Sequence, residues 1–588
     1  MFVRKNGIVE VLAWAALLFS AQLLPPSVFT QDAPAKPADR INGVVINSVT
    51  REPIARALVV SEGDRFATMT DNSGRFEFAF ADTSPGEPAA NGSGRPASGN
   101  IRPSYRPYTL TARKPGYLNG QDEQPSSAQR VIDGKEMEIA LVPEALIVGH
   151  VALPTSEPPD PIEVELFRRQ VRNGRAHWVS AGTQSTRSDG EFRFAELPAG
   201  TYKLLTHELR DADPKFSASG GQVYGYAPAY YPNASGFSSA GAIELTPGKT
   251  VQANLSLVRQ PYFPVIVPVT NVPPGRGFGL DVSVQGPGGP GYSLEYDYQK
   301  QALVGLLPNG NYQLRTINID ELGLSGEASI TVHGGAEGTV LPLATMPAVR
   351  VNVKDEFTSD VRAFTSTIVD NQGRQTTQQR RFDVTVTLQP ADDFRTEEQS
   401  ASTAGHPGTE TESTQFDRVM PGRYWVEVYP TSGYVASVTA GGVDLRQHPL
   451  VVPSGGSASV DVTLRNDTAS IEGVVEGASS LIGPAAPISL GPYGSASGSS
   501  SDSSARLYFI PLADSAGRFT EQNVHHDGKF SVSLPPGEYR VLAFPRVQPN
   551  LEYHNPVAMR AYDGKGQVVR LAGGQKEHLQ LQLVPSSD

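Results

Sequence analysis

The chain has 588 residues, and its 49 Lys and Arg residues against 61 Asp and Glu residues give a net charge of −12 at pH 7. This length predicts about four or five domains, and the lack of a basic stripe argues against nucleic acid as a partner. Because the sequence contains no cysteine, it offers no disulfide, no disulfide-linked partner, no thiolate metal site and no nucleophilic thiol.

The composition favours β-structure. Charged residues make up 19% of the chain, while Gly (58) and Pro (48) are abundant. This profile suits many short strands and tight turns, whereas helices would need more Ala, Leu, Glu and Lys. Without disulfides, each domain must be held by hydrophobic packing alone, which domains of about 100 residues can achieve.

The N-terminal segment has the features of an export signal. Arg4 and Lys5 precede an apolar run over 11–24, which small and polar residues follow up to Asp32. This pattern is typical of a secretory signal peptide, here 1–31, and predicts export to the periplasm, the cell surface or the medium. The apolar run is short for a membrane-spanning helix, although a signal-anchored form stays open. We expect no membrane span after the signal segment.

Five β-units are predicted to follow. Opening strands are apolar around a glycine at 41–45, 147–151 and 471–475, and closing strands alternate apolar and polar residues, as at 136–141 and 579–583. Strict alternation indicates a strand with one buried face. The predicted units are 41–143 with a loop insert at 82–106, 144–259 with an aromatic loop at 224–237, 260–345, 346–467 with a flexible insert at 392–414, and 468–588 with a flexible insert at 476–505.

A repeated phrase supports this division: a tight turn, an alternating strand, then Pro-Gly-x-Tyr and a second strand. It is complete at 188–205 and 526–542, degraded at 299–314 and 415–428, and lacks its second half at 72–80. Repeats about one hundred residues apart predict tandem domains.

Within this phrase the residue types predict an antiparallel hairpin. Phe192 and Phe194 fall on one face of the strand, with charged residues on the other. Gly190 and Gly200 allow positive φ where a side chain would clash. Tyr202 then starts the partner strand, and its hydroxyl can reach the backbone near the corner. The expected product is an antiparallel hairpin on one face of a two-sheet sandwich.

Together these motifs resemble the carboxypeptidase regulatory-like repeat, a transthyretin-like, prealbumin-type β-sandwich related to collagen-adhesin B-type repeats. The residues of the repeat signature are Gly43, Gly74, Phe76, Gly149, Gly190, Phe192, Pro198, Gly200, Tyr202, Gly310, Tyr312, Gly422, Tyr424, Gly473, Gly528, Phe530, Pro536, Gly537 and Tyr539. The resemblance implies an all-β fold: a tandem array of Ig/transthyretin-like antiparallel β-sandwich domains in an exported bacterial protein. It also implies that the repeat carries no catalytic residues.

No catalytic motif accompanies the repeats. Zinc peptidases need His and Glu close in sequence, and neither His-x-x-Glu nor His-Glu-x-x-His occurs. The one His cluster, 525–526 followed by Asp527, occupies a position where other repeats have a solvated turn. Since no Gly-x-Ser-x-Gly precedes a helix and no phosphate-binding loop is present, we expect no enzyme activity, no metal and no cofactor.

One aromatic loop stands apart from the repeat. It contains five aromatic rings and an asparagine, and the residues are Tyr224, Tyr226, Tyr230, Tyr231, Asn233 and Phe237. Exposed rings of this kind could stack on sugar rings as a glycan platform. The structural alternative, which we favour, is that the loop folds back and its rings cap the open end of the second sandwich.

These observations predict a non-catalytic exported protein with structural, adhesive or protein-interaction roles at the cell envelope. The partner would be an unknown envelope protein or an extracellular polysaccharide. Two alternatives remain: a carbohydrate-binding module that uses the aromatic loop, and an accessory or regulatory part of a peptidase system.

Overall fold

The computed structural model describes most of the chain after the predicted signal segment, which lies outside the described residues. The described residues are 39–61, 66–80, 109–118, 129–131, 136–154, 161–210, 222–273, 279–319, 323–335, 338–358, 363–369, 375–381, 384–394, 399–403, 413–455, 457–478, 505–512, 517–525 and 527–584. Within them, one short helix, α1 (Pro556–Met559), continues into a 3-10 turn (Arg560–Tyr562), and the other regular elements are strands. The all-β class is therefore confirmed.

The strands fall into five successive groups. The first group contains β1 (Asp39–Asn47), β2 (Leu58–Ser61), β3 (Ala67–Met69), β4 (Arg75–Phe80), β5 (Thr109–Arg113), β6 (Gln129–Arg130) and β7 (Met137–Leu141). The second contains β8 (Ala145–Ala152), β9 (Glu163–Arg172), β10 (Arg175–Ser185), β11 (Glu191–Leu197), β12 (Gly200–Thr206), β13 (Leu209–Arg210), β14 (Val223–Tyr226), β15 (Ile243–Leu245), β16 (Thr250–Gln252) and β17 (Leu255–Ser256). We call these groups units 1 and 2.

Units 3 to 5 follow in the same way. Unit 3 contains β18 (Arg259–Thr270), β19 (Leu280–Gly286), β20 (Gly289–Tyr292), β21 (Glu295–Asp297), β22 (Ala302–Pro308), β23 (Gly310–Ile319), β24 (Leu324–Ser325), β25 (Glu327–Val332), β26 (Leu341–Pro342) and β27 (Ala344–Thr345). Unit 4 contains β28 (Ala348–Asp355), β29 (Ala363–Val369), β30 (Gln375–Arg381), β31 (Val384–Pro390), β32 (Gln399–Thr403), β33 (Ser413–Phe416), β34 (Gly422–Pro430), β35 (Tyr434–Ala440), β36 (Val443–Asp444), β37 (Leu450–Val452) and β38 (Ser457–Arg465). Unit 5 contains β39 (Ala469–Glu476), β40 (Arg506–Pro511), β41 (Thr520–Asn523), β42 (Lys529–Leu534), β43 (Gly537–Phe544), β44 (Gln567–Leu571) and β45 (Lys576–Gln582), together with α1.

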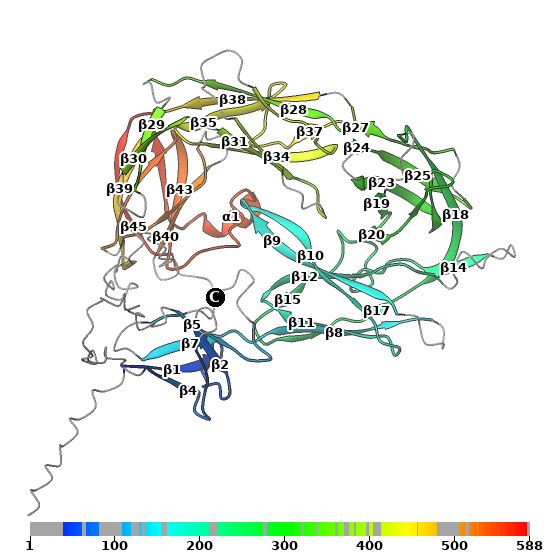
Figure 1. Cartoon of the computed structure of the whole chain (residues 1–588), viewed down its shortest axis with the longest axis horizontal. Coiled ribbons are helices and arrows are strands. Elements are labelled where there is room, and N and C mark those ends of the chain that lie inside the picture. The colour runs from blue at the N-terminus through cyan, green and yellow to red at the C-terminus, as the bar shows by residue number, and fades with distance from the viewer. Residues whose placement is uncertain are drawn as a thin grey trace, which may run out of the picture.

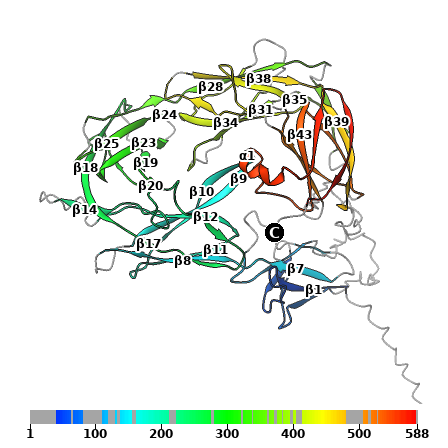
Figure 2. The same cartoon turned by 180° about the vertical axis from the view of Figure 1, so that it is seen from behind.

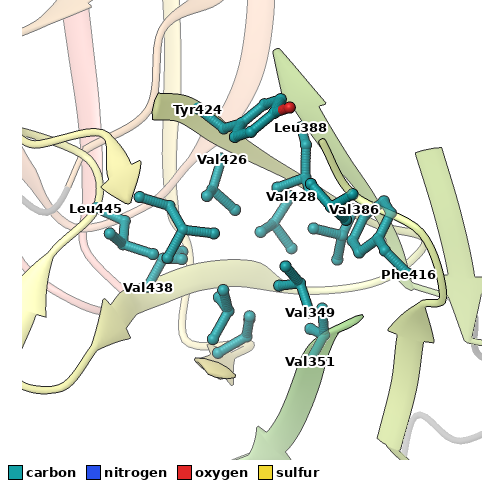
Figure 3. Close-up of a cluster of buried hydrophobic side chains, with 14 of the residues drawn as sticks. Val349, Val351, Val386, Leu388, Phe416, Tyr424, Val426, Val428, Val438 and Leu445 are labelled. Carbon is teal, nitrogen blue, oxygen red and sulfur yellow. The ribbon is translucent and has the colours of Figure 1, made fainter. Parts of the chain in front are cut away.

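Each unit packs two sheets around a hydrophobic core of its own. In unit 4, shown in Figure 3, Val349 on β28 faces Val386 and Leu388 on β31, and Tyr424 on β34 closes one side. Burial of each such side chain contributes about 1.5–3 kcal/mol. Because every unit repeats this arrangement, the chain is a tandem array of β-sandwiches.

The opening and closing strands of each unit lie side by side and run parallel. The pairs are β1 with β7, β8 with β16, β18 with β26, β28 with β38, and β39 with β45. The remaining ladders are antiparallel except β17 with β8, so the expected antiparallel sandwich is correct for most of each sheet. The alternating sequence predicted strands here but did not indicate the parallel pairing.

The glycine of the opening strand makes room for a phenylalanine on the neighbouring strand. Gly43, Gly149 and Gly473 stand directly opposite Phe76, Phe192 and Phe530 in the antiparallel ladders. A Cβ added to Gly473 would lie 2.7 Å from the Phe530 ring and 2.2 Å from the Leu579 carbonyl oxygen. The phenylalanine ring therefore covers the bare backbone of the glycine, and the two residue types occur together.

The turn glycines have a different role. Gly74, Gly190 and Gly528 adopt φ of 74°, 82° and 81°, a region that disfavours other residues. Their carbonyl oxygens accept hydrogen bonds from the amides of Val45, Val151 and Val475 in the opening strands, at 2.8, 2.9 and 2.8 Å. The turn is thus tied to the opening strand in units 1, 2 and 5.

A buried tyrosine fixes the corner between the two sheets in units 2 to 5. In each unit its hydroxyl donates to the carbonyl oxygen four residues earlier, and the pairs are Tyr202 with Pro198 (2.7 Å), Tyr312 with Pro308 (2.8 Å), Tyr424 with Met420 (2.6 Å) and Tyr539 with Pro535 (2.8 Å). Pro535 therefore takes the place of Pro198 in unit 5. Pro536 of the predicted repeat signature is the next residue along the chain.

Units 2 to 5 follow one another around an arc, and a long hairpin of unit 2 reaches across its interior (Figures 1 and 2). β14 of unit 2 pairs with β18 of unit 3, so these two units share one sheet. The hairpin of β9 and β10 extends from unit 2 to the neighbourhood of α1 in unit 5, as both views show. Its contacts there bring together residues separated by nearly 400 positions in the chain.

We predict that Gly473→Ala destabilises unit 5 by about 1–3 kcal/mol, because the added methyl group must displace the Phe530 ring or the Leu579 backbone. Calorimetry of the full chain would show a lower melting temperature for one transition. The control is Gly564→Ala, since a Cβ at Gly564 meets no atom within 4 Å. Equal effects of the two substitutions would contradict the packing role of Gly473.

Candidate functional site

The aromatic loop of unit 2 is mostly packed into the protein. Tyr226 is buried in the unit 2 core, and Tyr231 packs against that core. Tyr230 and Phe237 are also buried, but they belong to a second cluster on the outer face of the sheet formed by β10, β9, β12 and β15. The loop therefore packs on the unit 2 core through Tyr226 and Tyr231 and covers the outer face of this sheet through Tyr230 and Phe237.

This second cluster, which we call the outer aromatic cluster, is Phe167, Leu205, Tyr230, Phe237 and Ala240, with Trp178, Ala234 and Phe394 packed against it. Because it covers the outer face of β12, that strand is buried on both sides and even Lys203 is only 8% exposed. The Lys203 ammonium group donates to the carbonyl oxygens of Phe237 (2.7 Å) and Ser238 (3.2 Å). It also lies 4.9 Å from the ring centroid of Trp178, a cation–π distance that helps compensate for burial.

Phe394 enters this cluster from unit 4. Its ring lies edge-on to Phe237 and Phe167, with centroids 4.7 and 5.2 Å away. The backbone of Phe394 has φ of 68°, an uncommon conformation for a residue with a bulky side chain. Units 2 and 4 are therefore in direct contact through an aromatic side chain, although unit 3 separates them in sequence.

The other members of the predicted glycan platform do not form a flat surface with these rings. Tyr224 is 36% exposed and lies under the Arg259 guanidinium group, 4.3 Å from the ring centroid. Asn233 uses its side-chain oxygen to accept from the Ser256 amide at 3.1 Å. Because Tyr226, Tyr230 and Phe237 are buried, the structure brings the predicted site residues together as packing residues and leaves Tyr224 as the exposed ring among them.

The loop also joins unit 2 to unit 3. The Tyr230 hydroxyl donates to the Pro290 carbonyl oxygen at 2.8 Å, and the Phe237 amide donates to the Gly288 carbonyl oxygen at 2.7 Å. The Tyr230 ring lies so close to the Gly288 backbone that a side chain there would clash, because an added Cβ would lie 2.8 Å from the ring. The aromatic loop therefore joins units 2 and 3 in addition to the sheet that they share.

A buried carboxyl group lies at the same junction. Glu208 accepts from the amide and hydroxyl of Ser293 at 3.0 and 2.9 Å through one oxygen. Its other oxygen and the Tyr262 hydroxyl find no hydrogen-bond partner among the described residues. Burial raises the pKa of Glu208 even though Arg210 opposes this shift, because a charged carboxylate is disfavoured away from water.

The tip of the β9–β10 hairpin forms a separate contact site with units 4 and 5. Arg175 lies 3.7 Å from the Trp425 ring centroid, with Glu427 at 3.7 Å and the Arg446 carbonyl oxygen at 3.4 Å. Its side chain is 14% exposed, so a guanidinium group is largely enclosed by an aromatic face and a carboxylate. Stacking and ion pairing of this kind suit Arg better than Lys.

The turn of the same hairpin rests on unit 5. A Cβ at Gly174 would lie 2.6 Å from the Tyr553 ring, and the Gly174 carbonyl oxygen accepts from the His554 amide at 3.1 Å. Arg169 forms an ion pair with Glu552, which also accepts from Asn555 at 2.8 Å. Burial alone would raise the pKa of Glu552, but these hydrogen bonds from Arg169 and Asn555 lower it overall.

No motif in the sequence predicted this site. Asn173 and Gly174, with φ of 44° and 71°, form the Asn-Gly turn typical of a two-residue hairpin. This dipeptide could have located the hairpin tip. The residues that the tip contacts, on β34 and around 551–555, carry no local motif that would predict this contact.

A hollow between units 3 and 4 encloses about 600 Å³. Four of its charged groups form two ion pairs, Arg315 with Glu327 at 2.7 Å and Arg423 with Asp392, and Asp393 adds a further carboxylate. Val451 adds an apolar side chain to the lining. The lining therefore holds two guanidinium groups and three carboxylates, and most of its charge is neutralised within the hollow.

No metal site is formed within the described ranges. They contain no group of three or more His, Cys, Asp or Glu side chains arranged to hold an ion, and of the His cluster only His525 and Asp527 lie in them. The described residues also contain no helix with the length and hydrophobicity that crossing a bilayer requires.

No family model and no curated protein matches the chain. Among solved structures, the chain is similar to the Bacillus anthracis TIE protein, with 10% identity, 75% of this chain and 74% of that chain covered, and a TM-score of 0.15. It is also similar to two B repeat units of the collagen binding protein of Staphylococcus aureus (8% identity, 69% and 94% covered, TM-score 0.13) and to a streptococcal ancillary pilin (11%, 55% and 99%, 0.18). We draw no functional conclusion from similarities at this level, and the carboxypeptidase regulatory-like assignment stays a prediction.

We predict that Tyr230→Ala lowers the stability of unit 2 by about 3 kcal/mol, because it empties a buried position and removes the hydrogen bond to Pro290. Tyr224→Ala, at the exposed position of the same loop, should change stability far less. Calorimetric melting temperatures of the two variants provide the measurement. If Tyr230→Ala melted like the wild-type chain, the packing role of the loop would be wrong.

We also predict that Glu208→Gln removes part of the pH dependence of stability. A carboxyl group whose pKa is raised on folding binds more protons in the native state, so its contribution to stability falls as the pH rises above its ordinary pKa of about 4.5. The charged or titratable groups around Glu208 are His207, Arg210, Tyr262, Tyr292 and Tyr312. Melting temperatures of wild type and Glu208→Gln should therefore diverge in favour of the variant between pH 5 and pH 8, and parallel curves would contradict this role.

Proposed function

We propose that the chain is a non-catalytic exported protein of the cell envelope, in which joined β-sandwiches serve as a structural and adhesive scaffold. The observation that carries this proposal is that side chains brought together from distant parts of the sequence are used to join units. Trp425, Tyr553 and Phe394 fill inter-unit contacts, and Arg175 and Glu427 neutralise each other there. Contacts of this kind hold the units in a fixed arrangement.

The geometry that recurs from unit to unit supports the same proposal. Each unit has its own core, and its opening and closing strands pair in one ladder. Units 2 to 5 also share the tyrosine hydrogen bond at the corner. Successive units are joined by only a few residues, such as those between Leu141 and Ala145. Short connections keep successive units next to one another, which suits a spacer or a presenting surface.

The finer parts of the proposal rest on the sequence. The basic and apolar N-terminal segment supports export, and the repeat signature supports assignment to the carboxypeptidase regulatory-like family. We expect the partner to be an envelope protein or an extracellular polysaccharide that contacts the outer surfaces of the sandwiches.

Export can be tested in a bacterial host by cell fractionation and N-terminal sequencing. We predict that the full chain is recovered outside the cytoplasm with cleavage near residue 31, whereas a chain lacking residues 1–31 stays in the cytoplasm. Purified chain should also lack peptidase turnover, with and without a chelator. Cytoplasmic retention of the full chain, or turnover that persists through purification, would contradict the proposed function.

A further inference from the structure

The hairpin of β9 and β10 extends well beyond the sandwich that contains it. The strand β12 pairs with only the first part of β9, from Val164 to Arg168. Beyond that point the ladder consists of β9 and β10 alone, through Arg169 opposite Trp178 to Arg172 opposite Arg175. A two-stranded ribbon is marginally stable in water by itself. This distal part therefore depends on the packing of Trp178 on the outer aromatic cluster and on the surface that receives its tip.

The receiving surface is built by units 4 and 5 without help from the hairpin. Trp425, Glu427 and Tyr429 alternate along β34 and therefore lie on one face of that strand. The Arg518 guanidinium group of unit 5 lies 4.7 Å from the Tyr429 ring centroid. Next to it, Phe519 stacks on Tyr553 with centroids 3.8 Å apart and planes at 3°.

The same surface is held in place by further contacts within unit 5. Asn555 caps α1 by accepting from the amides of Val557 and Ala558, and its side-chain amide also donates to Glu552. The carboxylate that meets Arg169 is thus fixed by its own unit. We call the surface of Trp425, Glu427, Glu552, Tyr553 and His554 the receiving surface.

The contact between tip and receiving surface is mainly polar and aromatic. It consists of two ion pairs (Arg169 with Glu552, Arg175 with Glu427), the stacking of Arg175 on Trp425, and the placement of Gly174 on Tyr553. Two hydrogen bonds to backbone carbonyl oxygens, from Arg175 to Arg446 and from the His554 amide to Gly174, complete it. The core of each unit, by contrast, is a continuous cluster of buried aliphatic and aromatic side chains. The tip can therefore separate from the receiving surface while the units themselves remain folded.

We propose that the β9–β10 hairpin is a releasable clasp that closes units 2 to 5 into a ring. When Arg175 is seated on Trp425, unit 2 is tied to units 4 and 5. When it leaves, the arc opens at the connection 346–347 between units 3 and 4, and units 4 and 5 stay together through contacts such as Arg518 on Tyr429. Phe394 in the outer aromatic cluster is the second contact that closes the ring, so full opening requires both to separate. The inference concerns the conformation of the array and stands whether or not the envelope function is correct.

The absence of cysteine allows a direct measurement by single-molecule fluorescence transfer. Ala181→Cys on β10 and Gly564→Cys in unit 5 place two dyes at exposed positions on the two sides of the clasp. We expect a single high-efficiency population for the otherwise wild-type chain. Arg175→Ala should add a low-efficiency population, and Arg175→Ala with Phe394→Ala should make it dominant, accompanied by an increased radius of gyration in X-ray scattering.

The matched control is Arg172→Ala, because Arg172 stands directly opposite Arg175 in the hairpin and is exposed. It should leave both measurements unchanged. Circular dichroism and calorimetry of each variant would show that the units remain folded. Unchanged transfer and scattering in the Arg175→Ala, Phe394→Ala double variant would overturn the proposal, as would a dimeric mass showing that the hairpin binds a second copy.

Discussion

Every unit depends on the packing of two sheets against one another, since no disulfide is available to hold them. The opening strand is central to this packing because it pairs with an antiparallel strand on one side and with the parallel closing strand on the other. In units 1, 2 and 5 its glycine lets a phenylalanine ring lie across the backbone. The turn glycine and the corner tyrosine then connect the second sheet to this same strand and its neighbours.

The joints between units use features that the repeat does not provide. In unit 2 the sequence between β12 and β15 is long enough to cover the outside of its own sheet and to continue into β14, which pairs with unit 3. The rings of Tyr230 and Phe237 become buried there, and Phe394 arrives from unit 4 to complete the cluster. A segment outside the repeat thus determines how three units are arranged.

The sequence was sufficient to predict the local structure of the units, because alternating strands, tight-turn glycines and the Pro-Gly-x-Tyr phrase act over a few residues. It also identified the aromatic loop as unusual. It could not show that Arg175 meets Trp425 or that Phe394 reaches Phe237, since such contacts depend on how separate units are oriented.

The parallel pairing of the first and last strands in a unit has a mechanical consequence. The chain enters β39 at one end of unit 5 and leaves β45 at the opposite end. Tension applied to the two ends therefore pulls these strands along each other in shear, so that the hydrogen bonds of the ladder are loaded together and not opened one after another. The same strand order in the other units would give the whole array resistance to stretching without a covalent crosslink.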